Sequence, residues 1–335
     1  MTGKVTVTAT APSVSFTLYS DSGYTSPTKE ITPQTPVYMK ISVSGDNPLE
    51  EATITVKMFA DNNAAGVGTP PSSTSPETYV TFTISYDSGT GDWVLTADTG
   101  GSTTWSIQLD PNQQQADPTS SSGDFYVVIT FGKTAREADP TGNEAAPYAD
   151  WDIIVEATIG SGSLQASGSA SDYGYTVYFY SEITADMVEV NFGTITASSS
   201  SIIQEVKDSG GTTHSWHSFN VTVIANGDYD LLATTDSSWT NQSTGHTITL
   251  TTGTPGDGQF KLEVDDQEDT TNPGTPLNPV AVTSDPTTAS PFVDNALPTT
   301  ESGATTQIFM RITLGSNIYT GLYTGTITIH AVDGG

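Results

Sequence analysis

The most regular feature of this 335-residue chain is the alternation of apolar and polar residues. In the stretch 37–43, for example, Val37, Met39, Ile41 and Val43 stand at every second position. Successive side chains of a β-strand point to opposite faces, so a period of two predicts half-buried strands. No segment of ten residues has the period of an amphipathic helix. We therefore predict an all-β protein.

The clearest strands are expected at 5–10, 14–19, 37–43, 53–58, 79–86, 93–96, 105–109, 124–131, 151–159, 173–183, 188–195, 218–224, 229–233, 247–251, 259–264, 306–314 and 323–331. Short strands separated by turn residues are typical of β-sandwiches. Asn226-Gly227 is a strong hairpin signal, because both residues tolerate a positive φ, and it predicts that 218–224 pairs with 229–233. We expect two tandem β-sandwich domains of the immunoglobulin-like or jelly-roll type.

The boundary between the domains is expected at the stretch 161–171, where Gly, Ser and Ala dominate as in a flexible linker. This division gives a first sandwich at 12–160 and a second at 172–335. The second domain includes a Pro-rich segment, 265–300, which is too long for a simple connection within a compact domain.

Residues 1–11 carry a separate strand pattern in front of Pro12, in which Val5, Val7 and Ala9 alternate with threonines. Such a strand can add to the open sheet edge of a neighbouring molecule through main-chain hydrogen bonds. Repeated head to tail, that contact does not close and builds a fibre. The alternative is that 4–10 is the first strand of its own domain, and the sequence leaves both interpretations open.

The net charge of the chain limits the classes of partner that it can bind. A net charge of −29, from 9 Lys+Arg against 38 Asp+Glu, argues against nucleic acid and against anionic membrane surfaces. No apolar run approaches the roughly 20 residues of a membrane-spanning helix. The chain has no cysteine, which excludes disulfides and thiolate metal sites. Because it opens on a strand pattern rather than a signal peptide, we expect the numbering to start at a mature or engineered terminus.

Acidic residues suggest calcium as the cofactor, because Ca²⁺ takes six to eight oxygen ligands that flexible loops can supply. The densest group is Asp265, Asp266, Glu268 and Asp269, at the start of the Pro-rich segment. These four residues are the predicted metal site, although their spacing is not that of an EF-hand. A solvated acidic loop is the simpler interpretation.

Other candidate sites are weaker. Asn220 and Asn241 each begin an Asn-x-Ser/Thr triplet and are candidates for glycosylation. Trp239 stands among polar turn residues and is the candidate for an exposed ring that binds sugar. The sequence contains no Gly-x-Ser-x-Gly at a strand-to-helix junction and no phosphate-binding loop, so we predict that the protein is not an enzyme.

Several stretches resemble a known group of proteins. The segments 12–23, 31–44, 52–59, 123–131 and 151–157 resemble immunoglobulin-like domains of archaeal and some bacterial cell-surface proteins. The segments 221–231 and 321–330 are similar to β-sandwich modules of S-layer proteins and extracellular filament subunits. The resemblance implies a structural role at the cell surface and carries over no catalytic residue.

Three functions follow in order of preference. The first is an extracellular structural protein that self-assembles into a filament or a surface array, with other copies of itself as partners. The second is an adhesion or carbohydrate-binding module with glycans as partners, and the third is a viral tail or decoration protein.

Overall fold

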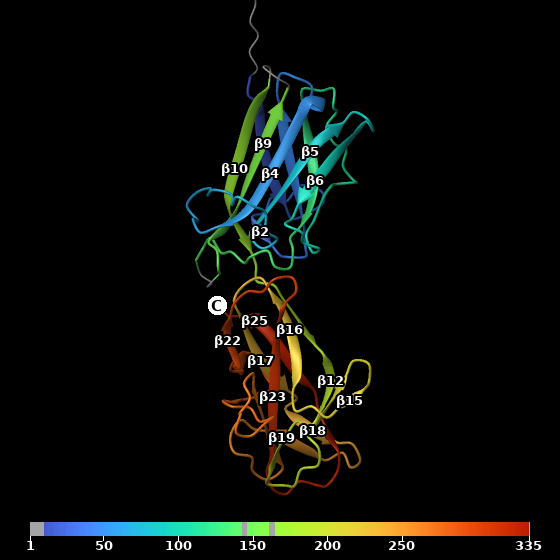
Figure 1. The fold of residues 1–335 in the computed structure, drawn as a ribbon, viewed down its shortest axis with the longest axis vertical. Helices are drawn as coiled ribbons and strands as arrows, with labels where there is room; N and C mark the ends of the chain where they lie inside the picture. Colours follow the sequence, from blue (N-terminus) through green and yellow to red (C-terminus); the bar gives the residue numbers. More distant parts are fainter. Residues whose placement is uncertain (1–9, 143–145, 161–164, 335) are drawn as a thin grey trace, which may run out of the picture. The chain divides into compact units, whose positions relative to one another are not determined.

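The computed structural model describes residues 10–142, 146–160 and 165–334. The chain divides into two compact units, Met1–Tyr180 and Ser181–Gly335, and in the described residues of each the regular secondary structure is almost entirely β-strand (Figure 1). The predicted all-β fold class is therefore confirmed. In the described part of the chain, no helix is long and apolar enough to cross a membrane.

The first unit contains two sheets. Its described elements are β1 (Ser13–Tyr19), β2 (Glu30–Ile31), β3 (Pro36–Ser44), the 3-10 turn η1 (Leu49–Glu51), β4 (Ala52–Asp61), β5 (Tyr79–Asp87), β6 (Asp92–Asp98), β7 (Ser106–Leu109), β8 (Ser122–Thr130), β9 (Asp150–Ile159) and β10 (Ala166–Val177). The strand orders are β1-β3-β8-β7 and β2-β10-β9-β4-β5-β6. The inner faces of the two sheets form one hydrophobic core.

Strand β9 is the best-paired strand of this core. It pairs antiparallel with β4 along its whole length, from Asp150 opposite Asp61 to Ile159 opposite Ala52. On its other side it pairs antiparallel with β10. Its core-facing side chains begin with Trp151 and Ile153, both almost fully buried. Alternation therefore places Asp150 and Asp152 on the outer face of the sheet.

The second unit contains three sheets. Its elements are β11 (Ser181–Ala185), β12 (Met187–Asn191), β13 (Ser200–Ile202), β14 (Glu205–Asp208), β15 (Thr213–His214), β16 (Phe219–Ala225), β17 (Tyr229–Thr235), β18 (Ser238–Asn241), β19 (Thr247–Leu250), β20 (Gln259–Asp265), β21 (Val280–Ala281), the short turn η3 (Pro286–Thr288), β22 (Val293–Ala296), β23 (Ala304–Leu314), β24 (Tyr323–Thr324) and β25 (Ile327–Asp333). The main path is β11-β16-β23-β20-β19-β18-β24, beside the sheets β12-β14-β15 and β22-β17-β25.

The hairpin predicted at Asn226-Gly227 is wrong. Strand β16 pairs with β11 and β23, whereas β17 pairs with β22 and β25, so the turn carries the chain from one sheet to another. Neither Asn226 nor Gly227 has a positive φ. Each strand buries apolar side chains and finds its main-chain partners in its own sheet, and these long-range pairings are not encoded in the two turn residues.

The linker predicted at 161–171 also differs from the structure. Residues from Ala166 onward belong to β10, which pairs with β9, and the division into units falls between Tyr180 and Ser181. Small polar residues are compatible with a strand when one neighbour supplies the main-chain partners. Composition alone cannot distinguish such a strand from a linker.

The Pro-rich segment 265–300 is not a plain loop. It contains two short strands, β21 beside β20 and β22 beside β17, with η3 between them. Strands of two to four residues are too short to show a period of two. The N-terminal strand predicted at 4–10, by contrast, falls mostly on residues 1–9, which lie outside the described residues.

The core of the second unit can be tested with two leucines. We expect Leu262→Ala in β20, where the side chain is 0% exposed, to lower the free energy of unfolding by about 2–5 kcal/mol, because it leaves a cavity. The matched variant Leu297→Ala, at a residue 77% exposed, should change it by less than about 0.5 kcal/mol. Urea unfolding followed by fluorescence measures both, and equal losses would show that β20 does not lie in the core.

Candidate functional site

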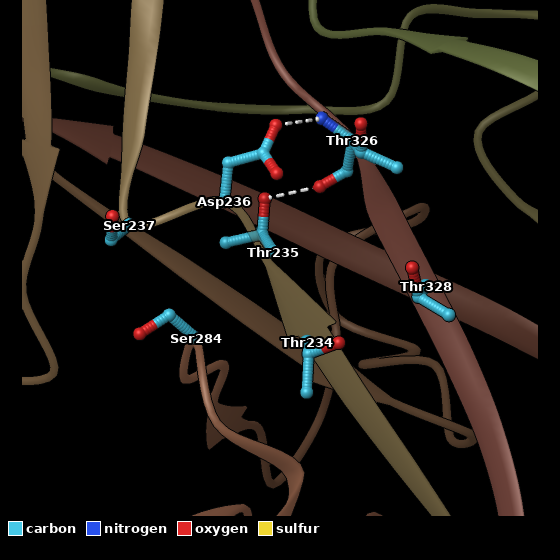
Figure 2. Close-up of a pocket in the computed structure, with 7 residues that line it drawn as sticks. All are labelled: Thr234, Thr235, Asp236, Ser237, Ser284, Thr326 and Thr328. Atoms are coloured by element: carbon cyan, nitrogen blue, oxygen red, sulfur yellow. Dashed lines mark hydrogen bonds between the residues drawn. The ribbon is translucent and has the colours of Figure 1, made fainter.

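A shallow polar pocket lies on the second unit. Its volume is about 420 Å³, and its lining consists of hydroxyl side chains and one carboxylate: Thr234, Thr235, Asp236, Ser237, Ser284, Thr326 and Thr328. Figure 2 shows Thr326 held from two sides: its N–H donates to Asp236 Oδ2 at 2.7 Å, and its carbonyl accepts from Thr235 Oγ1 at 2.7 Å. This lining can form hydrogen bonds to a polar ligand but presents no aromatic platform.

The aromatic platform expected from the sequence is also absent at Trp239. That ring is 7% exposed and donates from Nε1 to Thr235 Oγ1 at 2.9 Å, so it belongs to the interior. The exposed tryptophan is Trp216, which stacks on His214 with ring centroids 4.2 Å apart. Polar neighbours in sequence therefore did not indicate which ring is exposed.

An open sheet edge lies on the first unit. Among the described residues, only β9 pairs with β10 over residues 166–171, because β2 joins β10 at Thr176 and Val177. The core-facing positions of this stretch hold Ala166, Gly168 and Ala170, opposite the core residues of β9. The stretch therefore combines small inward side chains with a side on which no other described strand pairs.

The start of β1 lies against the same edge. A Cβ on Gly168 would overlap the carbonyl oxygen of Pro12, so this glycine permits a close approach of the two segments. Further along β1, Val14 and Phe16 pack on the core but are only partly buried. The seam between β1 and β10 is thus lined by half-covered apolar residues.

Three aspartates meet on the outer face of the six-stranded sheet. Asp61 ends β4 and stands opposite Asp150 of β9, and Asp152 lies two positions further on the same face. Asp150 and Asp152 are both 0% exposed. Their burial is unusual because carboxylates are seldom fully buried without a paired charge.

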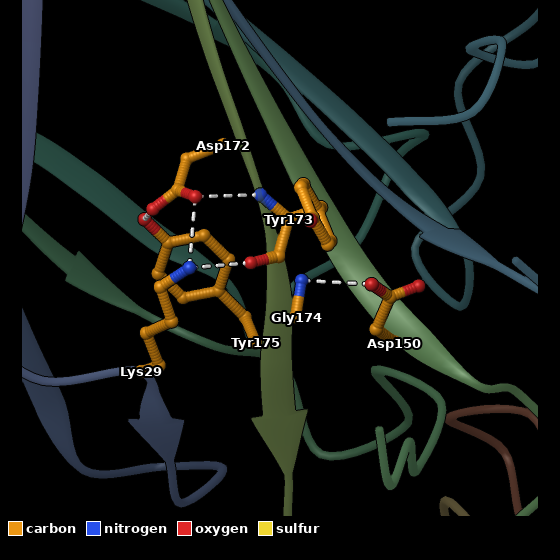
Figure 3. Close-up of polar contacts among 6 residues, drawn as sticks. All are labelled: Lys29, Asp150, Asp172, Tyr173, Gly174 and Tyr175. Carbon is orange, nitrogen blue, oxygen red and sulfur yellow. Dashed lines mark hydrogen bonds and ion pairs between the residues drawn. The ribbon is translucent and has the colours of Figure 1, made fainter. Parts of the chain in front are cut away.

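Main-chain donors hold one oxygen of each aspartate. Gly174 N donates to Asp150 Oδ2 at 2.7 Å, as Figure 3 shows, and Gly68 N donates to Asp152 Oδ2 at 2.5 Å. Asn62 N donates to Asp61 Oδ1 at 2.7 Å. The donors come from the β4–β5 connection and from the irregular stretch of β10, which cover this end of the sheet.

The other oxygen of each aspartate has no partner. Asp61 Oδ2, Asp150 Oδ1 and Asp152 Oδ1 are buried and form no hydrogen bond. An unsatisfied buried acceptor costs about 1–3 kcal/mol, and more when it is charged. One oxygen of each of the three carboxylates is therefore buried without a hydrogen bond from the described residues.

Lys29, whose positive charge acts on Asp150, forms its ion pair with another carboxylate. Lys29 Nζ lies 2.8 Å from Asp172 Oδ1 and 2.6 Å from the carbonyl of Tyr173, as Figure 3 shows. Burial raises the pKa of Asp152 to about 6; the Gly68 hydrogen bond opposes this rise, and the charges of Asp150 and Asp61 add to it. Burial also raises the pKa of Asp150.

The acidic group predicted at 265–269 is arranged differently. Asp265 is buried at the end of β20 and accepts from Asn278 N, and Glu268 accepts from Gly274 N at 2.7 Å. Hydrogen bonds from Thr271 and Asn272 lower the pKa of Asp269 to about 2. Burial raises the pKa of Asp266. These carboxylates thus shape local turns. Across the described residues, no three His, Asp or Glu side chains stand as a complete metal-ligand set.

The two glycosylation candidates differ in accessibility. Asn241 is 1% exposed, and its side chain donates to the Thr320 carbonyl while accepting from Ser243 N and Thr244 N. Asn241 is therefore not accessible for glycosylation in the folded chain. Asn220 is partly exposed on β16, where Nδ2 donates to Asp186 Oδ2 at 3.1 Å. The assembly residues Val5, Val7 and Ala9 lie outside the described residues.

Comparisons with known proteins add little. No family model matches the chain, and no curated protein matches it. One similar solved chain comes from work on a chaperone–tip adhesin complex in CFA/I fimbriae biogenesis, with a TM-score of 0.24 and 8% identity over 83% of this chain and 84% of that one. Similarity at this level carries no argument, so function rests on the residues themselves.

The raised pKa of Asp152 predicts that the free energy of unfolding depends on pH when it is measured in chelating buffer. In the folded state Asp152 takes up a proton near pH 6, well above its ordinary value of 3.8. Its contribution to stability therefore grows as pH falls through about 6 and is lost as pH rises, by up to about 3 kcal/mol. We expect the unfolding free energy of the wild type, relative to Asp152→Asn, to rise between pH 7 and pH 5. A constant difference would contradict the burial of this group.

Proposed function

We propose that this protein is an extracellular structural subunit that assembles with copies of itself into a filament or a surface array. The observation that carries the proposal is the open edge of β10 at residues 166–171, which pairs with β9 alone among the described strands. An unpaired strand edge is a template for another strand, and soluble proteins usually cover or disrupt such an edge. The acidic surface keeps the subunits soluble before assembly.

The strand that fits this edge is the segment 4–10 of a second molecule. It offers Val5, Val7 and Ala9 at alternate positions, and its seven residues are enough to span the six of the edge. Added to β10, these side chains would cover the small inward residues Ala166 and Ala170. Main-chain hydrogen bonds would supply affinity, and the alternating side chains would set the register.

The direction of the chain favours donation to a neighbour. β1 begins at Ser13 opposite Ser44, β4 begins at Ala52, and β10 begins at Ala166 opposite Ile159, which itself faces Ala52. The segment before β1 therefore enters at the end of the unit where β10 starts. To lie along its own β10 edge, the chain would have to reverse within residues 10–12, where Pro12 already lies against Gly168.

Deleting residues 1–11 tests the donated strand. We expect the shortened chain to remain folded by circular dichroism and to form no filaments or arrays in negative-stain electron microscopy, because the strand that joins the subunits is missing. If the shortened chain assembles as the full chain does, strand donation by this segment is wrong.

The acceptor edge can be tested with two neighbouring substitutions. Ala170→Leu adds bulk on the core-facing side of β10, and Ser169→Leu adds the same bulk on the outer face. We expect Ala170→Leu to reduce assembly at least tenfold, because the added side chain occupies the space of the incoming one, whereas Ser169→Leu should assemble normally. Sedimentation measures both, with thermal unfolding as the control for folding. Equal behaviour would place the contact elsewhere.

The hydroxyl-lined pocket supports a second candidate, a module that binds a glycan. Its lining of threonines, serines and Asp236 suits sugar hydroxyls. On a glycan array, this function predicts binding that Ser284→Trp removes by filling the pocket and that Leu297→Ala leaves unchanged. An array without binding would leave assembly as the function.

A further inference from the structure

Three aspartates lie on the outer face of the six-stranded sheet of the first unit, and two of them, Asp150 and Asp152, influence each other's charge. Asp150 and Asp152 are fully buried, and each has an oxygen without a partner. Asp61 adds a third carboxylate with a buried, unpartnered Oδ2. Lys29 is committed to Asp172 by a 2.8 Å ion pair. Like charges held together out of water destabilise a fold unless an opposite charge joins them.

We infer that Asp61, Asp150 and Asp152 bind a calcium ion between the β4–β5 connection and strand β9. The chemical type of the ligand atoms indicates which metal ion the site would bind. The unpartnered atoms are carboxylate oxygens, and hard cations prefer oxygen ligands to nitrogen or sulfur. Calcium fits better than magnesium because it accepts irregular ligand geometry and six to eight oxygens, which carbonyls and water can complete.

The hydrogen bonds to Asp150 and Asp152 leave one oxygen of each carboxylate for a cation. Gly174 N and Gly68 N each bind one oxygen of Asp150 and Asp152, which fixes the carboxylates and leaves Oδ1 of each for a cation. At Gly68 a Cβ would overlap the Asp61 carboxylate, so a larger residue there would require that side chain to move. The main chain therefore orients the carboxylates without neutralising them.

The three side chains do not yet stand at the spacing of a complete ligand set, since no such group of three occurs among the described residues. Binding must draw them together. The adaptable part is the segment after Asp61, whose sequence through Gly68 consists of Asn, Ala, Gly and Val. An ion held by Asp61 and Asp152 would fasten this connection to the central strand of the sheet.

Calcium titration of the full chain tests the inference. After removal of bound metal with chelator at pH 7.5, we expect calorimetric titration with CaCl₂ to show a site that Asp152→Asn abolishes. Calcium should also raise the midpoint of thermal unfolding of the wild type by several degrees, with a much smaller effect from the same concentration of MgCl₂. The Asn side chain still accepts from Gly68 N, so this variant is expected to fold.

Two controls distinguish calcium at this site from calcium bound elsewhere on the chain and from protonation of the cluster. Asp269→Asn changes a half-buried turn carboxylate and should leave calcium binding unchanged, whereas a loss there would move the site to the segment 265–269. Wild-type protein that gains stability on acidification in chelator, but shows no response to calcium at pH 7.5, would mean that protons alone relieve the cluster. Either that result or equal calcium binding by Asp152→Asn would overturn the inference.

Discussion

The pairing of β9 with strands on both of its sides is the constraint on which the rest of the first unit depends. Main-chain N–H and C=O groups must find partners when they are buried. β9 finds them in β4 and β10, and its core-facing side chains then anchor the six-stranded sheet on the four-stranded one. The same pairing fixes which side chains face outward, because successive side chains of a strand alternate between its two faces and a shift of one residue would exchange the faces of all of them.

Two functional features follow from this arrangement. Since β9 satisfies one side of β10, no other described strand pairs with the opposite side at residues 166–171, and this is where we propose that a second molecule adds a strand. Because Trp151 and Ile153 must face the core, Asp150 and Asp152 face outward, beneath the β4–β5 connection. The open edge and the aspartate cluster thus occupy opposite ends of β9: Ile159 faces Ala166, whereas Asp150 faces Asp61. An ion at the aspartates would stiffen the sheet without blocking the edge.

Alternation predicted the strands well but not their partners. The period of two indicated β3, β9 and β23 closely, because long amphipathic strands carry their own signal. It failed for β10, where Ala, Gly and Ser resemble a linker, and for Asn226-Gly227, where the turn joins two sheets. The aspartate cluster was missed because Asp152 lies on the polar face of a predicted strand, and only the fold shows that a loop covers it. The sequence does contain a signal for the cluster, in Asp150-Trp151-Asp152 and in Gly68 after Asp61. It can be recognised only once the fold is known.

Electron cryomicroscopy of the full-length chain tests the central claim most directly. Our account predicts filaments or sheets in which an additional strand, with side chains that fit 4–10 of a neighbouring molecule, lies along β10 at residues 166–171. Ordered assemblies with that edge empty, or only dispersed monomers with and without calcium, would contradict it.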